Sequence, residues 1–287
     1  MVFTSCTKAI EVKDVDFDVT TESVTYKVTD TVHFKFQGNP DNISFYSGEF
    51  GNDYQHINRT EMPINEIRPE LSFTSFRQFG NSNNTLRVLI STDFSGVYDS
   101  TNIYNATWTD ITSRVTLSTG LDNTPSGIVN LSDLNLTGAF YVAFRYTDIR
   151  QATTAQRTWT IRNFFINSIV IGNGASINVA DIVTASWTGV NIKNSARFWT
   201  FSSAQIQMGG GPANTADNED WAITKPIYLN KVNPDVAVGL KNLSTYLTTY
   251  AYKYTRPGTY KAVFIGSNTS KDDRKEVVRT INLTITP

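Results

Sequence analysis

The stretch from Tyr250 to Asn268 constrains the fold of this chain more than any other. Tyrosines alternate with smaller or polar residues over 250–254, which is the period-2 pattern of a half-buried β-strand. The Arg-Pro-Gly sequence at 256–258 predicts a tight turn, and the alternation resumes over 260–264. The pattern therefore predicts a β-hairpin. Because a hairpin alone is marginally stable in water, its partner strands must come from elsewhere in the chain.

Candidate partner strands lie near the N-terminus. In the segment 31–36, Val32, Phe34 and Phe36 point to one face and His33 to the other, as in a strand with one buried face. A Gly-Asn-Pro-Asp-Asn turn signal follows at 38–42. We expect four strands in this region, at residues 15–19, 24–28, 31–36 and 43–46.

The order of these segments resembles a PKD-type immunoglobulin-like sandwich. Asp30–Phe34 and Ile43–Gly51 match its first half, whereas the second half follows only at Tyr252–Phe264 and ends with Asn268 and a closing strand at 277–286. The resemblance implies a discontinuous sandwich built from residues 15–65 and 231–287, with strands near Phe34 and Phe264 in one core. Loop-closure entropy allows such an interruption, because each doubling of loop length costs only about 0.6 kcal/mol.

The intervening residues, 66–230, have a strand pattern of their own, with strands expected at 86–96, 106–112, 126–133, 141–146 and 158–166. Short strands at this spacing favour a sandwich or jelly roll, so the expected fold class is all-β. Ser91-Thr92-Asp93, Trp108-Thr109, Ala143-Phe144 and Trp159-Thr160-Ile161 together resemble jelly-roll modules of the cleaved-adhesin and choice-of-anchor kind. Glu219–Thr224 resembles another of their strands, which here follows the other motifs. The resemblance implies an inserted, galactose-binding-like jelly roll.

Cys6 is the single cysteine, so no intramolecular disulfide can form. Val2–Cys6 resembles the end of a bacterial lipoprotein signal, in which the cysteine becomes lipidated; the alternative is a free thiol at the terminus. The residues before Cys6 are too few for a signal core, so we expect the true start to differ from Met1. Residues 1–14 are expected to form a tether. No 18-residue apolar stretch exists, so an acylated Cys6 would be the only membrane anchor.

Taken together, the cysteine, the split sandwich and the jelly-roll segment resemble a Bacteroidetes surface-lipoprotein family described by a domain of unknown function, DUF5017. The resemblance covers nearly the whole chain. It implies a lipid-anchored protein of the outer membrane, at the cell surface, in a family considered with glycan uptake or adhesion. It carries no catalytic residues to this chain.

Charge and motif content narrow the function classes. The formal net charge is −1 and no Lys/Arg cluster is present, which disfavours a nucleic-acid partner. His33 and His56 cannot form a triad with Cys6. The acid pairs Glu219-Asp220 and Asp272-Asp273 are adjacent in sequence, so their side chains point apart in extended chain, unlike glycosidase acids across a cleft. The glycine run at 209–211 lacks the Lys-Ser/Thr of a phosphate loop. We expect no enzymatic activity.

Aromatic residues in polar surroundings are the strongest binding signal. Sugar recognition lays a ring face on an aromatic side chain, while nearby polar groups take the hydroxyls. Trp108 and Trp159 lie inside alternating strands and are interpreted as core. The alternative for the loop tryptophans is that they plug the ends of the jelly roll. The candidate ligand contacts are Trp187, Trp199, Trp221, Tyr98 and Tyr104.

Calcium is a weaker hypothesis. Asp93, Asp99 and Asp110 lie on turns that jelly rolls sometimes use for oxygen-rich sites, but Asp also populates such turns for backbone reasons, and no EF-hand spacing is present.

The leading functional hypothesis is a surface lipoprotein that binds a polysaccharide or oligosaccharide through its jelly roll. The alternative is a protein-interaction or adhesion module of an outer-membrane complex. A hydrolase would need a carboxylate pair across a cleft, and none is evident.

Overall fold

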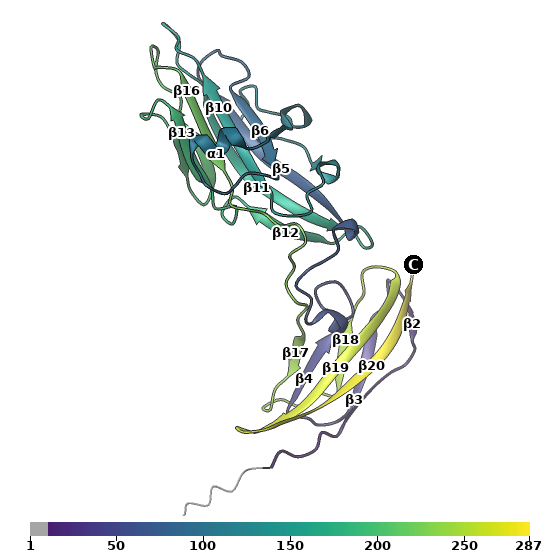
Figure 1. Ribbon diagram of the computed structural model, residues 1–287. Helices are drawn as coiled ribbons and strands as arrows, with labels where there is room; N and C mark the ends of the chain where they lie inside the picture. The colour runs from purple at the N-terminus through teal and green to yellow at the C-terminus, as the bar shows by residue number, and fades with distance from the viewer. Residues whose placement is uncertain (1–10) are drawn as a thin grey trace, which may run out of the picture. The chain divides into compact units, whose positions relative to one another are not determined.

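The computed structural model describes residues 11–287 and is all-β, as expected (Figure 1). The chain divides into two compact units. Unit 1 ends its first segment at Thr60 and resumes at Asn233, and unit 2 comprises Glu61–Val232. Among the described residues, no helix is long and apolar enough to cross a membrane.

Unit 1 contains two sheets. Its three-stranded sheet has the order β1, β3, β18, and its five-stranded sheet has the order β17, β4, β19, β20, β2. Neighbouring strands are antiparallel except β2 and β20, which are parallel. The strands predicted near the N-terminus are confirmed. The bounds are β1 (Phe17–Thr21), β2 (Thr25–Lys27), β3 (Val32–Gly38), β4 (Asn42–Tyr46), β17 (Val238–Lys241), β18 (Thr249–Tyr252), β19 (Gly258–Thr269) and β20 (Arg274–Thr286).

The core of unit 1 joins residues from both ends of the chain. Phe34 of β3 and Phe264 of β19 are fully buried, and their ring centroids lie 4.8 Å apart. Phe45 of β4 packs on both rings, at 5.8 Å from Phe34 and 4.8 Å from Phe264. The prediction that strands near Phe34 and Phe264 share one core is therefore confirmed.

The predicted hairpin around Pro257 is wrong. β18 pairs with β3, whereas β19 pairs with β4 and β20, so the turn carries the chain from one sheet to the other. The reason is burial of the tyrosines: Tyr250 and Tyr252 each pack edge-on against Phe45, across the core from β18. Tyr254 completes the crossing, because its buried hydroxyl donates to the carbonyl oxygen of Ser47 at 2.8 Å.

Unit 2 also contains two antiparallel sheets (Figure 1). The β10 sheet has the order β13, β16, β10, β6, β7, with bounds β13 (Thr188–Lys193), β16 (Asn218–Ile223), β10 (Tyr141–Asp148), β6 (Leu86–Ser91) and β7 (Thr109–Asp110). The β11 sheet has the order β14, β15, β11, β5, β8, with β12 also paired to β11 and β9 to β5. Its bounds are β5 (Ile67–Gln78), β8 (Thr124–Pro125), β9 (Val129–Asn130), β11 (Thr158–Val170), β12 (Ser176–Asp181), β14 (Trp199–Phe201) and β15 (Gln205–Met208).

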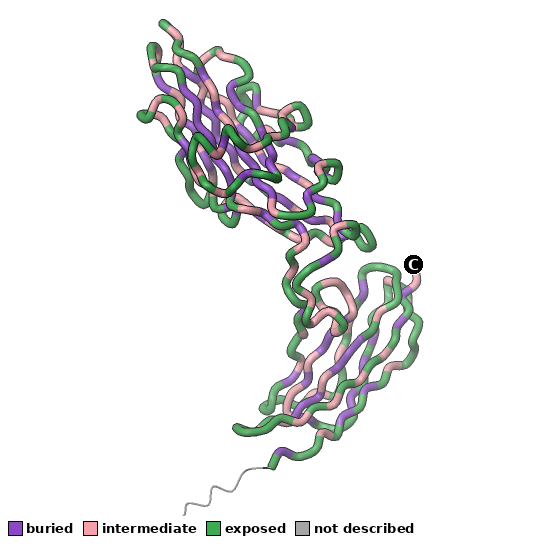
Figure 2. Tube along the Cα trace, viewed as in Figure 1, coloured by how far each residue is buried: buried purple, intermediate pink, exposed green. Residues whose placement is uncertain are grey.

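The β10 sheet is buried on both faces for part of its length. Its inner face carries Phe144, whose ring packs against Phe73 of β5 at 5.2 Å and Phe164 of β11 at 6.3 Å. On its outer face, a segment spanning 92–108 and containing α1 (Ser100–Asn105) packs Phe94 and Ile103 against the sheet. Buried residues accordingly follow the strands of this sheet, while most of the connecting loops are exposed (Figure 2).

Candidate functional site

The outer face of the β10 sheet, which bears Leu89, Ala143 and Trp221, holds an open cavity of about 440 Å³. The strand register sets its floor, because Arg145 of β10 lies opposite Arg87 of β6 on one side and Trp221 of β16 on the other. The 92–108 segment adds its wall. We call this cavity the aromatic pocket; its principal lining residues are Arg87, Tyr104, Trp108, Asp110, Arg145 and Trp221.

Two tryptophans and a paired charge lie together in the aromatic pocket. The rings of Trp108 and Trp221 are 5.2 Å apart and tilted by 53°. The Arg145 guanidinium lies 5.5 Å from the centroid of the Trp221 ring, in cation–π range. Glu219 Oε1 accepts from Arg145 Nε at 3.0 Å and from Trp221 Nε1 at 3.2 Å. The ion pair and the indole therefore fix one another.

Charges in the aromatic pocket occur in pairs. Arg87 Nη1 lies 2.5 Å from Asp110 Oδ2, and Arg145 Nη2 lies 2.9 Å from Glu219 Oε1. Burial would raise the pKa of Asp110, but hydrogen bonds from Thr112 and the pairing with Arg87 outweigh it, and the pKa is lowered. Burial and the nearby Glu219 carboxylate raise the pKa of Tyr104. At neutral pH the pocket therefore offers the protonated phenol of Tyr104 and the ionised carboxylate of Asp110.

The segment that supplies Tyr104 and Trp108 is held by local polar contacts. Asp99 caps the N-terminus of α1 by accepting from the Asn102 backbone N–H at 2.8 Å. Asp93 Oδ1 accepts from Ser91 Oγ and from the Thr107 backbone N–H, both at 2.8 Å. Trp108 Nε1 donates to the carbonyl oxygen of Ile103 at 2.9 Å. The aromatic side chains are therefore set in place by their own loop.

These contacts give separate structural roles to Asp93, Asp99 and Asp110, the candidate calcium ligands. Each of the three carboxylates serves its own stretch of chain: a loop closure, a helix cap and the pair with Arg87. Within residues 11–287, no three or more His, Cys, Asp or Glu side chains gather where they could hold a metal ion. The three aspartates do not form one site.

The predicted ligand contacts separate into two groups. Trp221 lines the aromatic pocket although it is only 3% exposed, and Tyr104, also in the lining, is 57% exposed. Tyr98 is half-buried, packs on Phe94, and donates from its hydroxyl to the Thr224 carbonyl oxygen at 3.0 Å. Tyr98 therefore holds the 92–108 segment in place and does not line the aromatic pocket.

Trp187 and Trp199 do not line the aromatic pocket: Trp199 is buried, and Trp187 is half-buried and packs against the inner-face aromatics of unit 2. Trp187 lies 5.5 Å from Phe144 and 4.9 Å from Phe164, and its Nε1 donates to the Ile182 carbonyl oxygen. Trp199 is 3% exposed and lies 6.4 Å from Phe144. Polar neighbours in the sequence suggested loops at the surface, but these residues face inward between the two sheets.

Trp108 also lines the aromatic pocket, and the sequence did not predict it as a candidate contact. It was interpreted as core because it lies in an alternating segment, but β7 contains only Thr109 and Asp110, and Trp108 is half-buried in the pocket wall. The polar stretch before it, which includes Asn102 and Asn105, is the signal that a loop precedes it. The prediction that Trp159 is a core residue is confirmed, because it is 3% exposed and donates to Thr85 Oγ1 at 2.9 Å.

Cys6, the predicted lipidation site, lies outside the described residues.

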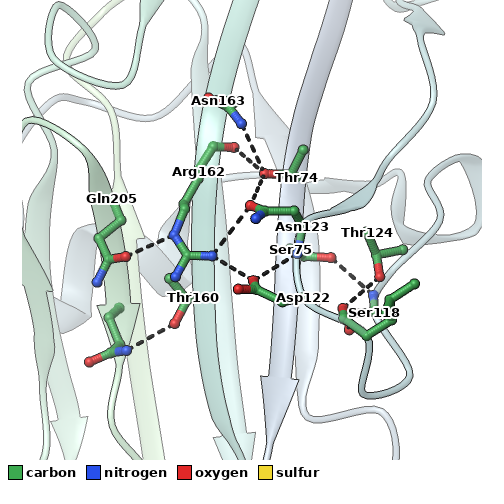
Figure 3. A network of polar contacts seen from close by, with 12 residues as sticks. Thr74, Ser75, Ser118, Asp122, Asn123, Thr124, Thr160, Arg162, Asn163 and Gln205 are labelled. Carbon is green, nitrogen blue, oxygen red and sulfur yellow. Dashed lines mark hydrogen bonds and ion pairs between the residues drawn. The ribbon is translucent and has the colours of Figure 1, made fainter.

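The outer face of the β11 sheet is a less suitable ligand surface, because its polar groups bond to one another (Figure 3). Arg162 donates from Nε to Gln205 Oε1 at 2.9 Å and from Nη1 to Asp122 Oδ1 at 2.6 Å. Gln207 Nε2 donates to Thr160 Oγ1 at 2.9 Å. A ligand there would have to replace bonds that are already made.

Comparison with known protein families gives a match over much of the chain. A family model described as "Domain of unknown function (DUF5017)" matches residues 5–187, which is more than half of the chain. The matched range includes Tyr104, Trp108 and Arg145 and ends before Glu219 and Trp221. No curated protein and no solved structure matches.

Proposed function

The chain belongs to the DUF5017 family, and we propose that it is a non-enzymatic protein that binds an uncharged glycan in the aromatic pocket of unit 2. One observation carries the proposal: the Trp108–Trp221 pair and the exposed Tyr104 share a cavity with the Arg87–Asp110 ion pair and with Arg145, whose carboxylate partner Glu219 is buried beside it. Aromatic faces suit the apolar faces of sugar rings, and the paired charged groups supply donors and acceptors for hydroxyls.

The balance of charge favours an uncharged ligand. Arg87 and Arg145 are the cations in the lining, and each is already paired with a carboxylate. A polyanion would gain little attraction from neutralised pairs and would meet the carboxylate of Asp110. Hydroxyl groups can donate to this carboxylate and accept from the guanidinium groups without breaking either pair.

Two variants and a matched control test the proposal by affinity electrophoresis in gels containing galactomannan, xyloglucan, mixed-linkage β-glucan or starch. We expect at least one of these to retard the wild type, and heparin not to. Trp108→Ala and Tyr104→Ala should each weaken binding about tenfold, because each removes an aromatic contact surface. Tyr246→Ala is the control, since Tyr246 is also exposed, at 73%, but lies in unit 1.

Two variants are used so that a loss of binding can be distinguished from misfolding of the 92–108 segment. Trp108 packs against Phe94, so its removal can disturb the 92–108 segment, whereas Tyr104 is exposed and its removal leaves that packing intact. Retention that Tyr104→Ala and Tyr246→Ala reduce equally would argue against the pocket. A wild-type protein that none of the four polysaccharides retards would overturn the proposal.

The finer fold and the cellular setting are part of the same proposal. The three-stranded and five-stranded sheets of unit 1 support a PKD or immunoglobulin-like sandwich, and the two antiparallel sheets of unit 2 support a jelly roll. The Val2–Cys6 sequence supports a surface lipoprotein of the outer membrane, anchored by an acyl chain on Cys6. Mass spectrometry of the N-terminal peptide from native membranes tests the acylation.

A further inference from the structure

A second open cavity, of about 660 Å³, adjoins the aromatic pocket in unit 2. Arg145 lines both cavities, and its partner Glu219 lines the second, so the Arg145–Glu219 pair stands where the two meet. The second cavity is otherwise polar, with Asn81, Asn83 and Asn84 from the β5–β6 loop among its lining residues. We call it the amide pocket.

The β5–β6 loop is held by its backbone and by Ser82. Arg157 Nε donates to the Ser82 carbonyl oxygen at 2.9 Å, and Arg157 Nη1 donates to the Phe79 carbonyl oxygen. Ser82 Oγ donates to Asp148 Oδ1 at 2.6 Å, and Asp148 Oδ2 in turn accepts from the Arg157 backbone N–H at 2.8 Å. The loop conformation is thus fixed from beneath by one arginine and one aspartate.

The asparagine side chains take no part in holding this loop. Asn81, Asn83 and Asn84 are exposed, and none of their side-chain amides makes a hydrogen bond to another residue of the described chain. Each amide offers two donors and an acceptor oxygen. Because the loop backbone is already fixed, a ligand that bonds these amides orders their side chains but not the loop, which lowers the entropy lost on binding.

We propose that the amide pocket is a second sugar subsite, continuous with the aromatic pocket, so that the ligand is an uncharged oligosaccharide that spans both. This inference rests on the proposed glycan function. Sugar rings stack in the aromatic pocket, the Arg145–Glu219 pair bonds hydroxyls at the junction, and the asparagine amides bond the hydroxyls of the next sugar units. Affinity therefore depends on the length of the oligosaccharide.

The test is a titration of the intact protein, followed by tryptophan fluorescence, with manno-, xylo-, cello- and malto-oligosaccharides of one to six units. For the series that binds, affinity should rise about tenfold between the shortest oligosaccharides and those long enough to reach both pockets. The double variant Asn81→Ala/Asn83→Ala should abolish this rise and leave binding of the shortest oligosaccharides unchanged. Asn84 is left intact because its φ of 54° makes alanine unfavourable there.

A matched control and distinct outcomes separate this inference from the glycan function itself. Asn65→Ala/Asn178→Ala removes two exposed amides of unit 2 outside both pockets, and it should keep the full dependence on length. A wild-type affinity that does not change with length, or a rise that survives in Asn81→Ala/Asn83→Ala, overturns the second subsite and leaves the aromatic pocket standing. Failure of every oligosaccharide of every length to bind the wild type overturns both.

Discussion

Asp220 is a buried carboxyl group whose pKa is raised, so the stability of unit 2 should depend on pH through it. It lies on the inner face of β16, opposite Tyr146 in the register, and is 1% exposed. Burial raises its pKa from 3.8 to about 8, against opposing hydrogen bonds from Asn218 and Asn191. A raised carboxyl pKa contributes stability that is fully present below pH ~4 and is lost as pH rises toward 8, at up to about 1.4 kcal/mol per pH unit.

Asp220→Asn should remove this pH dependence. The amide is nearly isosteric and has no proton to lose, so the variant should match the wild type near pH 4 and melt several degrees higher at pH 8. A stability change of 1 kcal/mol shifts Tm by about 2–4 °C in a unit of this size. Thermal unfolding by circular dichroism across pH 4–8 measures the difference.

Asp217→Asn is the control for Asp220→Asn. It makes the same chemical change at an exposed neighbour, whose Oδ1 accepts from the Arg150 backbone N–H at 2.7 Å. A gap between wild type and Asp220→Asn that stays constant from pH 4 to pH 8 would contradict the assignment of the shift to Asp220.

The tryptophans show how far single residues can be interpreted from sequence. Trp159 sits in a long alternating strand, and its burial followed from that pattern. Trp187 and Trp199 have polar sequence neighbours like those of Trp221, yet only Trp221 faces the outer side of its sheet. The face depends on strand register, which is set by partners far away in the sequence. Sequence therefore identified Tyr104 and Trp221 as candidates but could not join them to Trp108 and Arg145.

Glycines at the turn after β4 provide a prediction about how elements approach one another. Gly48 and Gly51 have nearly the same positive φ, 81° and 83°, so alanine at either costs about 1 kcal/mol in backbone conformation. A Cβ on Gly48 would lie 2.7 Å from the backbone nitrogen of Lys261 in β19, whereas a Cβ on Gly51 would meet nothing within 4 Å. Gly48→Ala should therefore lower the free energy of unfolding by about 3 kcal/mol and Gly51→Ala by about 1 kcal/mol.

Urea unfolding of the two glycine variants measures the difference directly, since the backbone term is common to both. Equal losses would mean that β4 and β19 can separate at this turn without penalty. The comparison isolates steric contact between two elements from conformational strain within one.

Elements were predictable where the local pattern was clear, as in the alternation of β3 and the apolar run of β10. The link between β18 and β19 was not, because an Arg-Pro-Gly turn can either fold a strand back beside its predecessor or send it to the opposite sheet. Only the packing of Tyr250 and Tyr252 on Phe45 distinguishes these outcomes. β5 was also missed as a strand: its residues alternate in burial, but Pro69 lies within it, and proline weakens a strand assignment.

At the scale of the whole molecule, the chain passes between the units twice, and each unit contains contacts that hold its own two ends of these connections together. In unit 1, Asp235 is 4% exposed, its Oδ1 lies 2.9 Å from Arg59 Nη2, and its backbone N–H donates to the His56 carbonyl oxygen at 3.2 Å. In unit 2, Glu61 and Lys231 form an antiparallel bridge and an ion pair. Each unit therefore holds together the two chain segments at which the other is attached.

This closure predicts that each unit folds without the other. Replacing Glu61–Val232 by a short Gly-Ser linker should leave unit 1 with cooperative thermal unfolding, because Arg59 and Asp235 already hold the linker ends in place and a short loop adds little closure entropy.

The isolated Glu61–Val232 fragment should keep the glycan affinity of the full chain within about twofold, since all lining residues of both pockets lie inside it. Circular dichroism melting and the polysaccharide gels test the two pieces. A fragment that folds but no longer binds would show that the pockets depend on unit 1, and a unit 1 variant that melts without cooperativity would show that its core requires the inserted residues.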